Sequence, residues 1–248
     1  MRVVRGRAAD REGERSESSE RVSGAPANRD ADHAVTRDLL DWVRERGEPA
    51  VRVWAPGQVV AFGRRDANED GYDAAVEAAT DHGFPTVERR VGGRAVAYTD
   101  TTLAFARFTP TEDIRTGLTE RYDAMVADVT DALREVGVAS ARAGEPPDSF
   151  CPGDHSVRAD CGKLAGVAQR VTKGAALTSG VLVVDDRDAI AGVLGDVYPA
   201  LGVAFDPDSV GSVAAAGGDP ERVRDELERT LVGDAECEVV AADNVLSE

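Results

Sequence analysis

Lysine is almost absent from this chain. Of its 29 cationic side chains only two are lysine, Lys163 and Lys173, and the other 27 are arginine. The 46 acidic residues give a net charge of −17 and a pI near 4.6. This balance excludes a nucleic-acid partner, because binding to a phosphate backbone needs a basic surface. Abundant Asp and Glu with so little Lys is typical of proteins from a high-salt cytoplasm, and we treat halophily as a hypothesis that the folded fraction at different salt concentrations would test.

Long apolar runs and cysteines are also scarce. No run reaches the roughly 18 apolar residues that a membrane span needs, and residues 1–30 lack the apolar core of a secretory signal. We therefore expect a cytoplasmic protein with no membrane partner. In a reducing compartment, three cysteines (Cys151, Cys161 and Cys237) do not predict a disulfide framework. Packing, metal binding or catalysis remain as their roles.

The chain is long enough to bury one large core, and its composition predicts one domain with a tail. Residues 1–28 are rich in Arg, Glu, Ser, Gly and Pro, which predicts a flexible N-terminal tail, and residues 29–248 make up the predicted domain. Apolar spacing predicts helices from Asp32 to Gly47, over 69–82, over 117–136 and within 219–233, where Asp219 and Pro220 would be the N-cap and first helical residue. Strands are predicted in AVRVWA, QVVAFG, TLAFARF and GVLVVDD. These patterns indicate an α+β fold, a mixed, largely antiparallel sheet flanked by helices.

Two adjacent glycines lie between strand-like segments, within Arg89-Arg90-Val91-Gly92-Gly93-Arg94-Ala95-Val96. Glycine has no Cβ, so backbone N–H groups in such a turn can approach a carbonyl or phosphate oxygen closely. Arg89, Arg90 and Arg94 add charge that could hold an anion. Taken alone, however, the segment is more typical of an ordinary hairpin turn with its arginines in water.

Lys163 lies in a strand-like segment of small residues, CGKLAGVAQR. The chain uses arginine almost everywhere else, and arginine cannot replace lysine where a compact ammonium is needed. This makes Lys163 a candidate functional residue, and the alternative is a chance survivor whose tip reaches solvent. Lys173 fits that alternative better, because it adjoins Gly174 in a predicted turn.

Cys151 directly precedes Pro152-Gly153, so a turn could present its sulfur to a cleft. A nearby cation would favour the reactive thiolate. A buried, inert cysteine is the alternative. Cys151, His155 and Cys161 could also bind a metal, although a fourth ligand is missing and we assign no metal site.

Taken together, these segments resemble the lipoate–protein ligase and octanoyltransferase superfamily, to which the biotin–protein ligase fold is related. RRVGGRAVAYTD resembles the family's binding loop, RR-x-(S/T)GG-x-AV-x-HD, and GKLAGVAQR resembles the strand whose lysine contacts the acyl carbonyl. VRVWAPGQVVAFGR is similar to the family's entry segment, and the resemblance covers about residues 32–215. It implies a biotin/lipoate ligase-like catalytic domain over 29–248. The implied substrate-binding residues are Arg89, Arg90, Gly92, Gly93, Arg94, Ala95, Val96, Gly166 and Ala168.

SFCPGDHSV, with Cys151 twelve residues before Lys163, is similar to the cysteine-dependent branch of this family. The resemblance implies an amidotransferase that forms an acyl-thioester on Cys151 and passes an octanoyl or lipoyl group from a donor protein to a lysine of a lipoyl-domain protein. Lys163 would favour the thiolate and attract the oxyanion, and no cofactor would be needed. Two positions depart from the family pattern, because no Ser or Thr precedes the glycines and Thr99-Asp100 stands where His-Asp is usual.

Three alternatives remain. An ATP-dependent lipoate–protein ligase would use ATP and magnesium to form lipoyl-adenylate from lipoate. This chain is short for a ligase with its own carboxy-terminal domain, so it would then need a separate accessory subunit. A biotin–protein ligase fits Cys151 and Lys163 less well. A non-catalytic subunit that only binds lipoyl proteins would tolerate arginine in place of Lys163.

Overall fold

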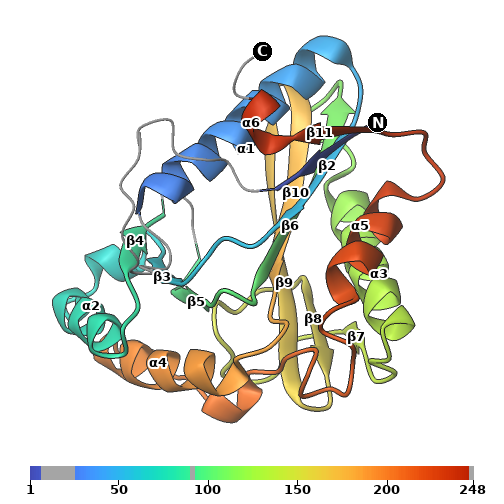
Figure 1. The fold of residues 1–248 in the computed structure, drawn as a ribbon. Helices are drawn as coiled ribbons and strands as arrows, with labels where there is room; N and C mark the ends of the chain where they lie inside the picture. Colours follow the sequence, from blue (N-terminus) through green and yellow to red (C-terminus); the bar gives the residue numbers. More distant parts are fainter. Residues whose placement is uncertain (7–25, 90–92, 246–248) are drawn as a thin grey trace, which may run out of the picture.

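The computed structural model describes residues 1–6, 26–89 and 93–245. Its strands form an eight-stranded sheet and a three-stranded sheet (Figure 1). The large sheet has the order β11 (Glu238–Ala241), β1 (Arg2–Arg5), β2 (Ala50–Trp54), β6 (Leu103–Thr111), β10 (Gly174–Leu182), β9 (Gly162–Thr172), β8 (Ser156–Ala159) and β7 (Arg142–Ala143). The small sheet has the order β4 (Thr86–Glu88), β3 (Val59–Phe62) and β5 (Val96–Tyr98).

Most neighbouring strands are antiparallel. The parallel pairs are β1 with β2, β1 with β11, and β3 with β4. The helices are α1 (Pro26–Arg46), α2 (Tyr72–Asp81), α3 (Leu118–Glu135), α4 (Arg187–Ala200), α5 (Val223–Val232) and α6 (Ala242–Val245), with 3₁₀ turns at Asp66–Asn68 and Pro207–Ser209. The predicted α+β fold with a largely antiparallel sheet flanked by helices is confirmed.

Three hydrophobic clusters join the helices to the sheets. Helices α3 and α5 cover one face of the large sheet, and α1 covers part of the other face (Figure 1). Strand β6 contributes side chains to both faces of the sheet. Phe105 packs in the cluster under α3, and Phe108, three residues later and so on the opposite face, packs in the cluster under α1. Helices α2 and α4 pack with the small sheet in the third cluster. Burying apolar area on both faces of the central strands provides the main driving force for this arrangement.

Helix α3 shows why the apolar spacing was informative. Met125, Val129 and Leu133 recur every four residues and are completely buried against the sheet. This period matches one face of an α-helix. Gly47 follows α1 with a φ of 68°, a conformation that glycine adopts without a Cβ penalty, so the predicted end of this helix is also confirmed.

A buried ion pair fixes α1 on the sheet. Arg52 of β2 is completely buried, forms an ion pair with Asp32 of α1, and stacks 4.3 Å from the ring centre of Trp54. Removing either charge would leave the other unpaired away from water, which is strongly destabilising. The VRVW segment therefore has a structural role in this fold.

Three predicted boundaries are wrong. Residues 2–5, expected within a flexible tail, form β1 between β2 and β11, where Val3 and Val4 are buried. Residues 7–25 lie outside the described residues, so the division at residue 28 stays a prediction. The strand predicted from Gly180 begins already at Gly174. The last long helix begins at Val223, and Asp219 instead accepts hydrogen bonds from the backbone of the turn before it.

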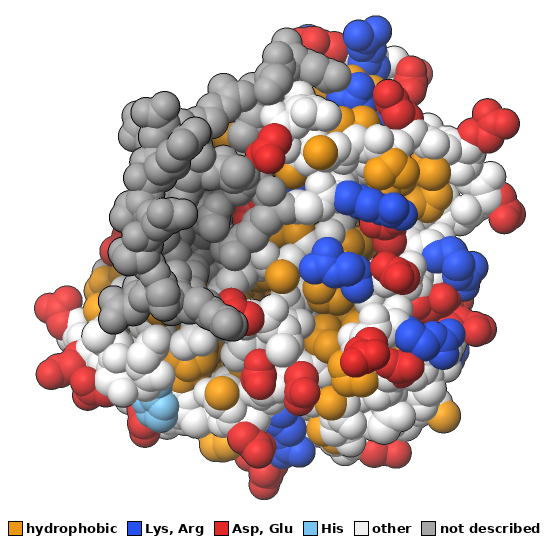
Figure 2. Space-filling view, viewed as in Figure 1, with side chains coloured by type: hydrophobic (Ala, Val, Ile, Leu, Met, Phe, Trp, Pro, Cys, Tyr) orange, Lys and Arg blue, Asp and Glu red, His pale blue; other side chains and the backbone are white. Residues whose placement is uncertain are grey.

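Acidic side chains are distributed over the described part of the face seen in Figure 2, with basic side chains interleaved on the side of α5 and β11. Every helix in the described ranges is too short or too polar to cross a membrane. Halophily stays a prediction.

Candidate active site

Cys151 ends a segment that we call the cysteine loop, residues 145–151, between β7 and β8. Its backbone has a φ of 41°, and Asp148 in the same loop has a φ of 48°. A residue with a Cβ pays about 1–2 kcal/mol for this left-handed conformation. Such strain persists only where surrounding contacts impose it, and it is concentrated at functional sites.

Lys163 supplies several of those contacts. It lies near the start of β9, and its side chain is only 1% exposed. Its Nζ donates hydrogen bonds to Glu145 Oε1 at 2.9 Å, to the carbonyl oxygen of Phe150 at 3.0 Å and to that of Cys151 at 3.1 Å. These three bonds use all three donors of an ammonium group. The lysine that the composition singled out therefore holds both ends of the cysteine loop.

Glu145 is the counter-ion of this buried ammonium, and sequence reasoning missed it. Its Oε1 also accepts a hydrogen bond from Ser149. Its Oε2 is buried and has no hydrogen-bond partner in the part of the chain that the structure describes. The sequence offers no signal for Glu145, because nothing local distinguishes it from the other 45 acidic residues.

The glycine loop, residues 89–96, meets the cysteine loop at Gly93. A Cβ built on Gly93 would lie 2.9 Å from Cys151 Sγ and 3.5 Å from Arg89 Nη2, and Gly93 has a φ of 96°. The thiol therefore occupies the space that a side chain at residue 93 would need. A Cβ on Gly63, directly after β3, would lie 2.0 Å from the carbonyl oxygen of Gly93, so backbone packs on backbone here.

The two described arginines of the glycine loop, Arg89 and Arg94, have different contacts. Arg89 Nη2 donates to the carbonyl oxygen of Arg94 at 2.6 Å. Burial lowers the pKa of Arg89, but the charges of Tyr98 and Cys151 and a side-chain hydrogen bond with Cys151 outweigh it, and the pKa is raised overall. Arg89 also lines a pocket of about 240 Å³.

Arg94 instead contacts carboxylates. Its Nη1 bonds Glu69 at 2.7 Å and the buried Asp66 at 3.2 Å. The hydrogen bond with Glu69 is the main cause of the raised pKa of Arg94. The Arg94 guanidinium therefore ties the glycine loop to Asp66 and Glu69, and the backbone carbonyl of Arg94 orients Arg89.

One expected contact differs from the structure. We expected the Lys163 ammonium to face the Cys151 thiol, yet its three hydrogen bonds go to carbonyl and carboxylate oxygens. The Arg89 guanidinium is the cation beside the thiol, since a Cβ built on Gly93 would lie 3.5 Å from Arg89 Nη2 and 2.9 Å from Cys151 Sγ. Lys163 still meets Cys151 at its backbone carbonyl, so both cations converge on this residue from different directions.

The remaining predicted residues that the structure describes lie in the glycine loop and along β9. Ala95 and Val96 are buried, and Gly166 lies beside Lys163, since a Cβ there would be 3.7 Å from Nζ. Ala168 is exposed two residues further along β9, on the same face as Gly166. Arg90 and Gly92 lie outside the described residues.

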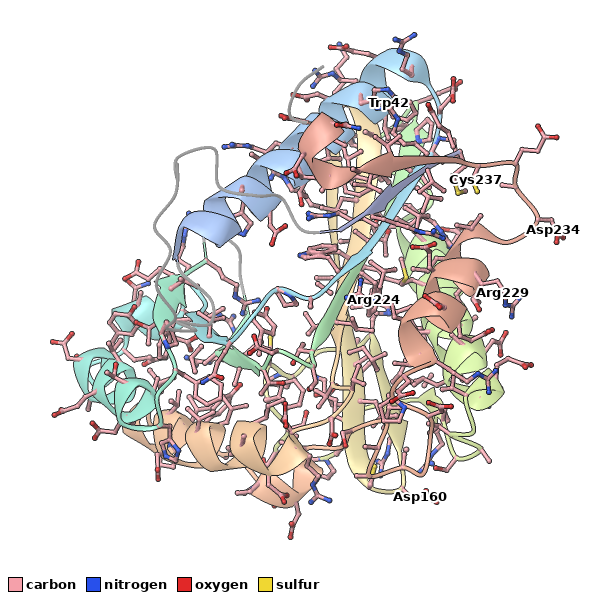
Figure 3. All side chains as sticks on the ribbon, viewed as in Figure 1. Trp42, Asp160, Arg224, Arg229, Asp234 and Cys237 are labelled. Atoms are coloured by element: carbon pink, nitrogen blue, oxygen red, sulfur yellow. The ribbon has the colours of Figure 1, made fainter. Side chains whose placement is uncertain are left out.

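The other cysteines lie apart from the site. Cys161 is partly buried, with its sulfur 3.8 Å from the carbonyl oxygen of Ser212. Cys237 is exposed on the segment between α5 and β11 (Figure 3). The His155 ring stacks on Tyr122 with ring centres 3.7 Å apart. Among the described residues no three His, Cys, Asp or Glu side chains form a metal-binding group, so the alternative of a Cys151–His155–Cys161 metal site has no support.

Tyr198 of α4 is a second residue that sequence reasoning missed. Its hydroxyl accepts a hydrogen bond from the backbone N–H of Cys151 at 2.5 Å and donates to the carbonyl oxygen of Ala95 at 3.0 Å. Buried tyrosines are common in helices, and only the tertiary structure brings this one to the site.

The chain is similar to curated octanoyl- and lipoyltransferases. The chain is 32% identical over 155 residues to an octanoyl-[GcvH]:protein N-octanoyltransferase of Exiguobacterium sibiricum, covering 61% of this chain and 55% of that protein. A protein of the same name from Geobacillus kaustophilus is 29% identical over 52% of this chain and 45% of its own length. A lipoyl-[GcvH]:protein N-lipoyltransferase of Listeria monocytogenes is 25% identical over 62% and 55%. These matches span about half the length of the curated relatives.

Solved structures show the same fold. A lipoate-protein ligase A bound with ATP superposes with a TM-score of 0.64 at 21% identity, covering 88% of this chain and 87% of that one. A bi-partite lipoate protein ligase from Thermoplasma acidophilum gives a TM-score of 0.56 at 20% identity over 87% and 86%. Residues 30–223 match the family model described as the lipoyl protein ligase A/B catalytic domain. The chain therefore belongs to the lipoyl protein ligase A/B catalytic domain family.

Proposed function

We propose that this protein is an acyltransferase that moves an octanoyl or lipoyl group from a donor protein onto a lysine of a lipoyl-domain acceptor protein, through a thioester on Cys151. The observation that carries this proposal is the packing of Cys151 Sγ against the side-chain-free Gly93 and the Arg89 guanidinium. An inert, buried cysteine would not need a left-handed backbone held by a buried lysine. The names of the curated relatives, octanoyl- and lipoyl-[GcvH] transferases, support the same reaction class.

The first half-reaction is acylation of the enzyme. The Cys151 thiolate, next to the Arg89 guanidinium, attacks the acyl carbonyl of the donor. The carbon–sulfur bond forms and the bond between the acyl carbon and the donor nitrogen breaks. The leaving amine takes up the proton that the Cys151 thiol lost when the thiolate formed. Arg89 contributes a positive charge beside the attacking sulfur.

The second half-reaction regenerates the thiol. The ε-amine of the acceptor lysine attacks the thioester, the carbon–nitrogen bond forms, and the carbon–sulfur bond breaks. The amine proton passes to the departing sulfur. In both steps negative charge develops on the acyl oxygen, which a preorganised cation stabilises.

Lys163 is placed to supply that cation, but its three donors are occupied. One hydrogen bond must be released before the ammonium can bind the acyl oxygen. The carbonyls of Phe150 and Cys151 are fixed by the loop, whereas Glu145 is a side chain that can rotate. We therefore assign Glu145 as the exchangeable partner that neutralises Lys163 in the free enzyme.

An ATP-dependent ligase is the second candidate, because one structural relative is a lipoate-protein ligase A bound with ATP. That reading requires ATP and magnesium, free lipoate and an accessory subunit, whereas the transferase needs no cofactor. The discriminating assay supplies the purified protein and an acceptor lipoyl domain with either octanoylated GcvH alone or free lipoate with and without ATP and magnesium. We expect transfer from octanoylated GcvH without ATP. Strict dependence on ATP and free lipoate would establish the ligase, and no transfer under any condition would favour a non-catalytic lipoyl-protein-binding subunit.

Gly93→Ala is expected to lower the rate of acyl transfer by about 100-fold, because displacing a reacting group by about 1 Å has effects of this size. The new Cβ would need to lie 2.9 Å from Cys151 Sγ, so the thiol must move away from Arg89. Single-turnover measurement of the acyl-enzyme checks this.

Gly202→Ala is the matched control, since Gly202 also has a positive φ (68°) but open space around its Cβ position. It should lose about 1 kcal/mol of stability and keep full activity, and equal rates in both variants would show that the thiol does not depend on Gly93.

A further inference from the structure

A buried hydroxyl forms hydrogen bonds with both the cysteine loop and the glycine loop. The Tyr198 side chain is 0% exposed, and its Oη lies between the backbone N–H of Cys151 and the carbonyl oxygen of Ala95. Cys151 and Ala95 lie 47 and 103 residues before Tyr198 in the chain, so no local structure brings them together. The ring itself packs in the cluster of α2, α4 and the small sheet, with the Phe205 ring centre 4.9 Å away.

Both hydrogen bonds require a neutral phenol. The oxygen accepts from Cys151 and donates to Ala95, a combination that phenylalanine cannot make and that a phenolate could make only in part. Burial raises the pKa of Tyr198, and this effect outweighs the hydrogen bond from the Cys151 backbone, which lowers it. The hydroxyl therefore remains protonated over the whole pH range in which proteins function.

The backbone of Cys151 is held from both sides. Lys163 binds the carbonyl oxygens of Phe150 and Cys151, and Tyr198 binds the N–H of Cys151. Together these contacts hold Cys151 in its left-handed conformation with a φ of 41°. Lys163 acts within the large sheet, whereas Tyr198 hydrogen-bonds both Cys151 and Ala95. It therefore also relates Cys151 to Gly93, two residues before Ala95 in the same loop.

We propose that Tyr198 is a positioning residue for the acylation of Cys151. Its hydroxyl fixes the distance and direction between the sulfur and the glycine loop that would hold the acyl group. The expected effect on acylation rests on the proposed function. The placement of the thiol by Tyr198 can be tested without any acyl substrate.

Tyr198→Phe removes one oxygen and keeps the ring. Its matched control is Tyr72→Phe, because Tyr72 belongs to the same hydrophobic cluster and its hydroxyl bonds Glu88 at 3.0 Å, away from Cys151. Two rates are measured for each protein: single-turnover acylation by octanoylated GcvH, followed by intact mass, and alkylation of Cys151 by iodoacetamide, followed by peptide mass spectrometry. The second rate reports the thiol alone and distinguishes Cys151 from Cys161 and Cys237.

We expect Tyr198→Phe to acylate about 100-fold more slowly with a KM for the donor within about twofold of the wild type, and to alkylate Cys151 several-fold more slowly, because the sulfur leaves the Arg89 guanidinium. Tyr72→Phe should match the wild type in both rates. An acylation or alkylation rate of Tyr198→Phe at or above the wild-type value overturns the proposal, and so does a loss confined to KM.

Two further results separate the possible failures. If wild-type Cys151 forms no adduct with the donor while Tyr198→Phe still slows alkylation, the proposed function fails and the positioning role stands. Should Tyr198→Phe not fold, hydrogen exchange of the Cys151 amide in the wild-type protein decides the question. Strong protection supports the bond to Tyr198, and exchange at the rate of an open loop overturns it.

Discussion

Replacing Cys151 with alanine is expected to abolish the acyl-enzyme and to lower acyl transfer by a factor of about 10³ to 10⁶, the range seen when a covalent nucleophile is removed. The fold should remain, because Lys163 and Tyr198 bind the backbone of Cys151 and not its sulfur. Alanine can retain both of those bonds and pays the same cost for a positive φ. The loss should therefore appear in the rate of the first half-reaction, with an unchanged melting temperature.

Cys161→Ala and Cys237→Ala are the controls for this experiment. The Cys161 sulfur bonds a backbone carbonyl oxygen, and Cys237 is exposed. Both variants should gain one octanoyl mass on Cys151 and turn over as the wild type does. Full transfer activity in Cys151→Ala would rule out the thioester mechanism, whatever the other variants show.

The sequence allowed the fold class to be predicted because its long, regular elements follow local rules. The four-residue spacing of Met125, Val129 and Leu133 and the glycine after α1 do not depend on the rest of the chain. Strand β1 could not be predicted in this way. Its Val3-Val4 pair is too short to specify a strand, and its pairing depends on β11, more than 200 residues later in the sequence.

The same distinction applies to the site. Gly93 and Lys163 could be identified from the sequence, since a glycine pair and a rare lysine are visible without a structure. Glu145 and Tyr198 could not, because an acid among 46 and a tyrosine on an apolar helix face acquire their roles only through tertiary contacts. The sequence predicted that Arg89 binds an anion, and only the packed loops show that its guanidinium lies beside the thiol.

Lys163→Arg is expected to lower acyl transfer by about 100- to 1,000-fold, the loss typical for a displaced oxyanion-stabilising donor. The structure indicates that this variant also loses stability. The side chain is 1% exposed, and a wider guanidinium must fit where Nζ now reaches three oxygens within 3.1 Å. Overpacking of this kind typically costs about 1–3 kcal/mol.

Lys173→Arg provides an internal control that few proteins offer, because it makes the same substitution at the only other lysine. Lys173 is exposed in the turn between β9 and β10, so its replacement should change neither the melting temperature nor the transfer rate.

Lys163→Met distinguishes the effect of the charge from that of the side-chain shape, because methionine has a similar length and leaves Glu145 without its cation. If charge alone mattered, arginine at position 163 would retain activity and methionine would not. Because the cysteine loop is held by three short bonds to one compact ammonium, we expect both variants to be inactive, and an active Lys163→Arg enzyme would show that Lys163 does not act through this geometry.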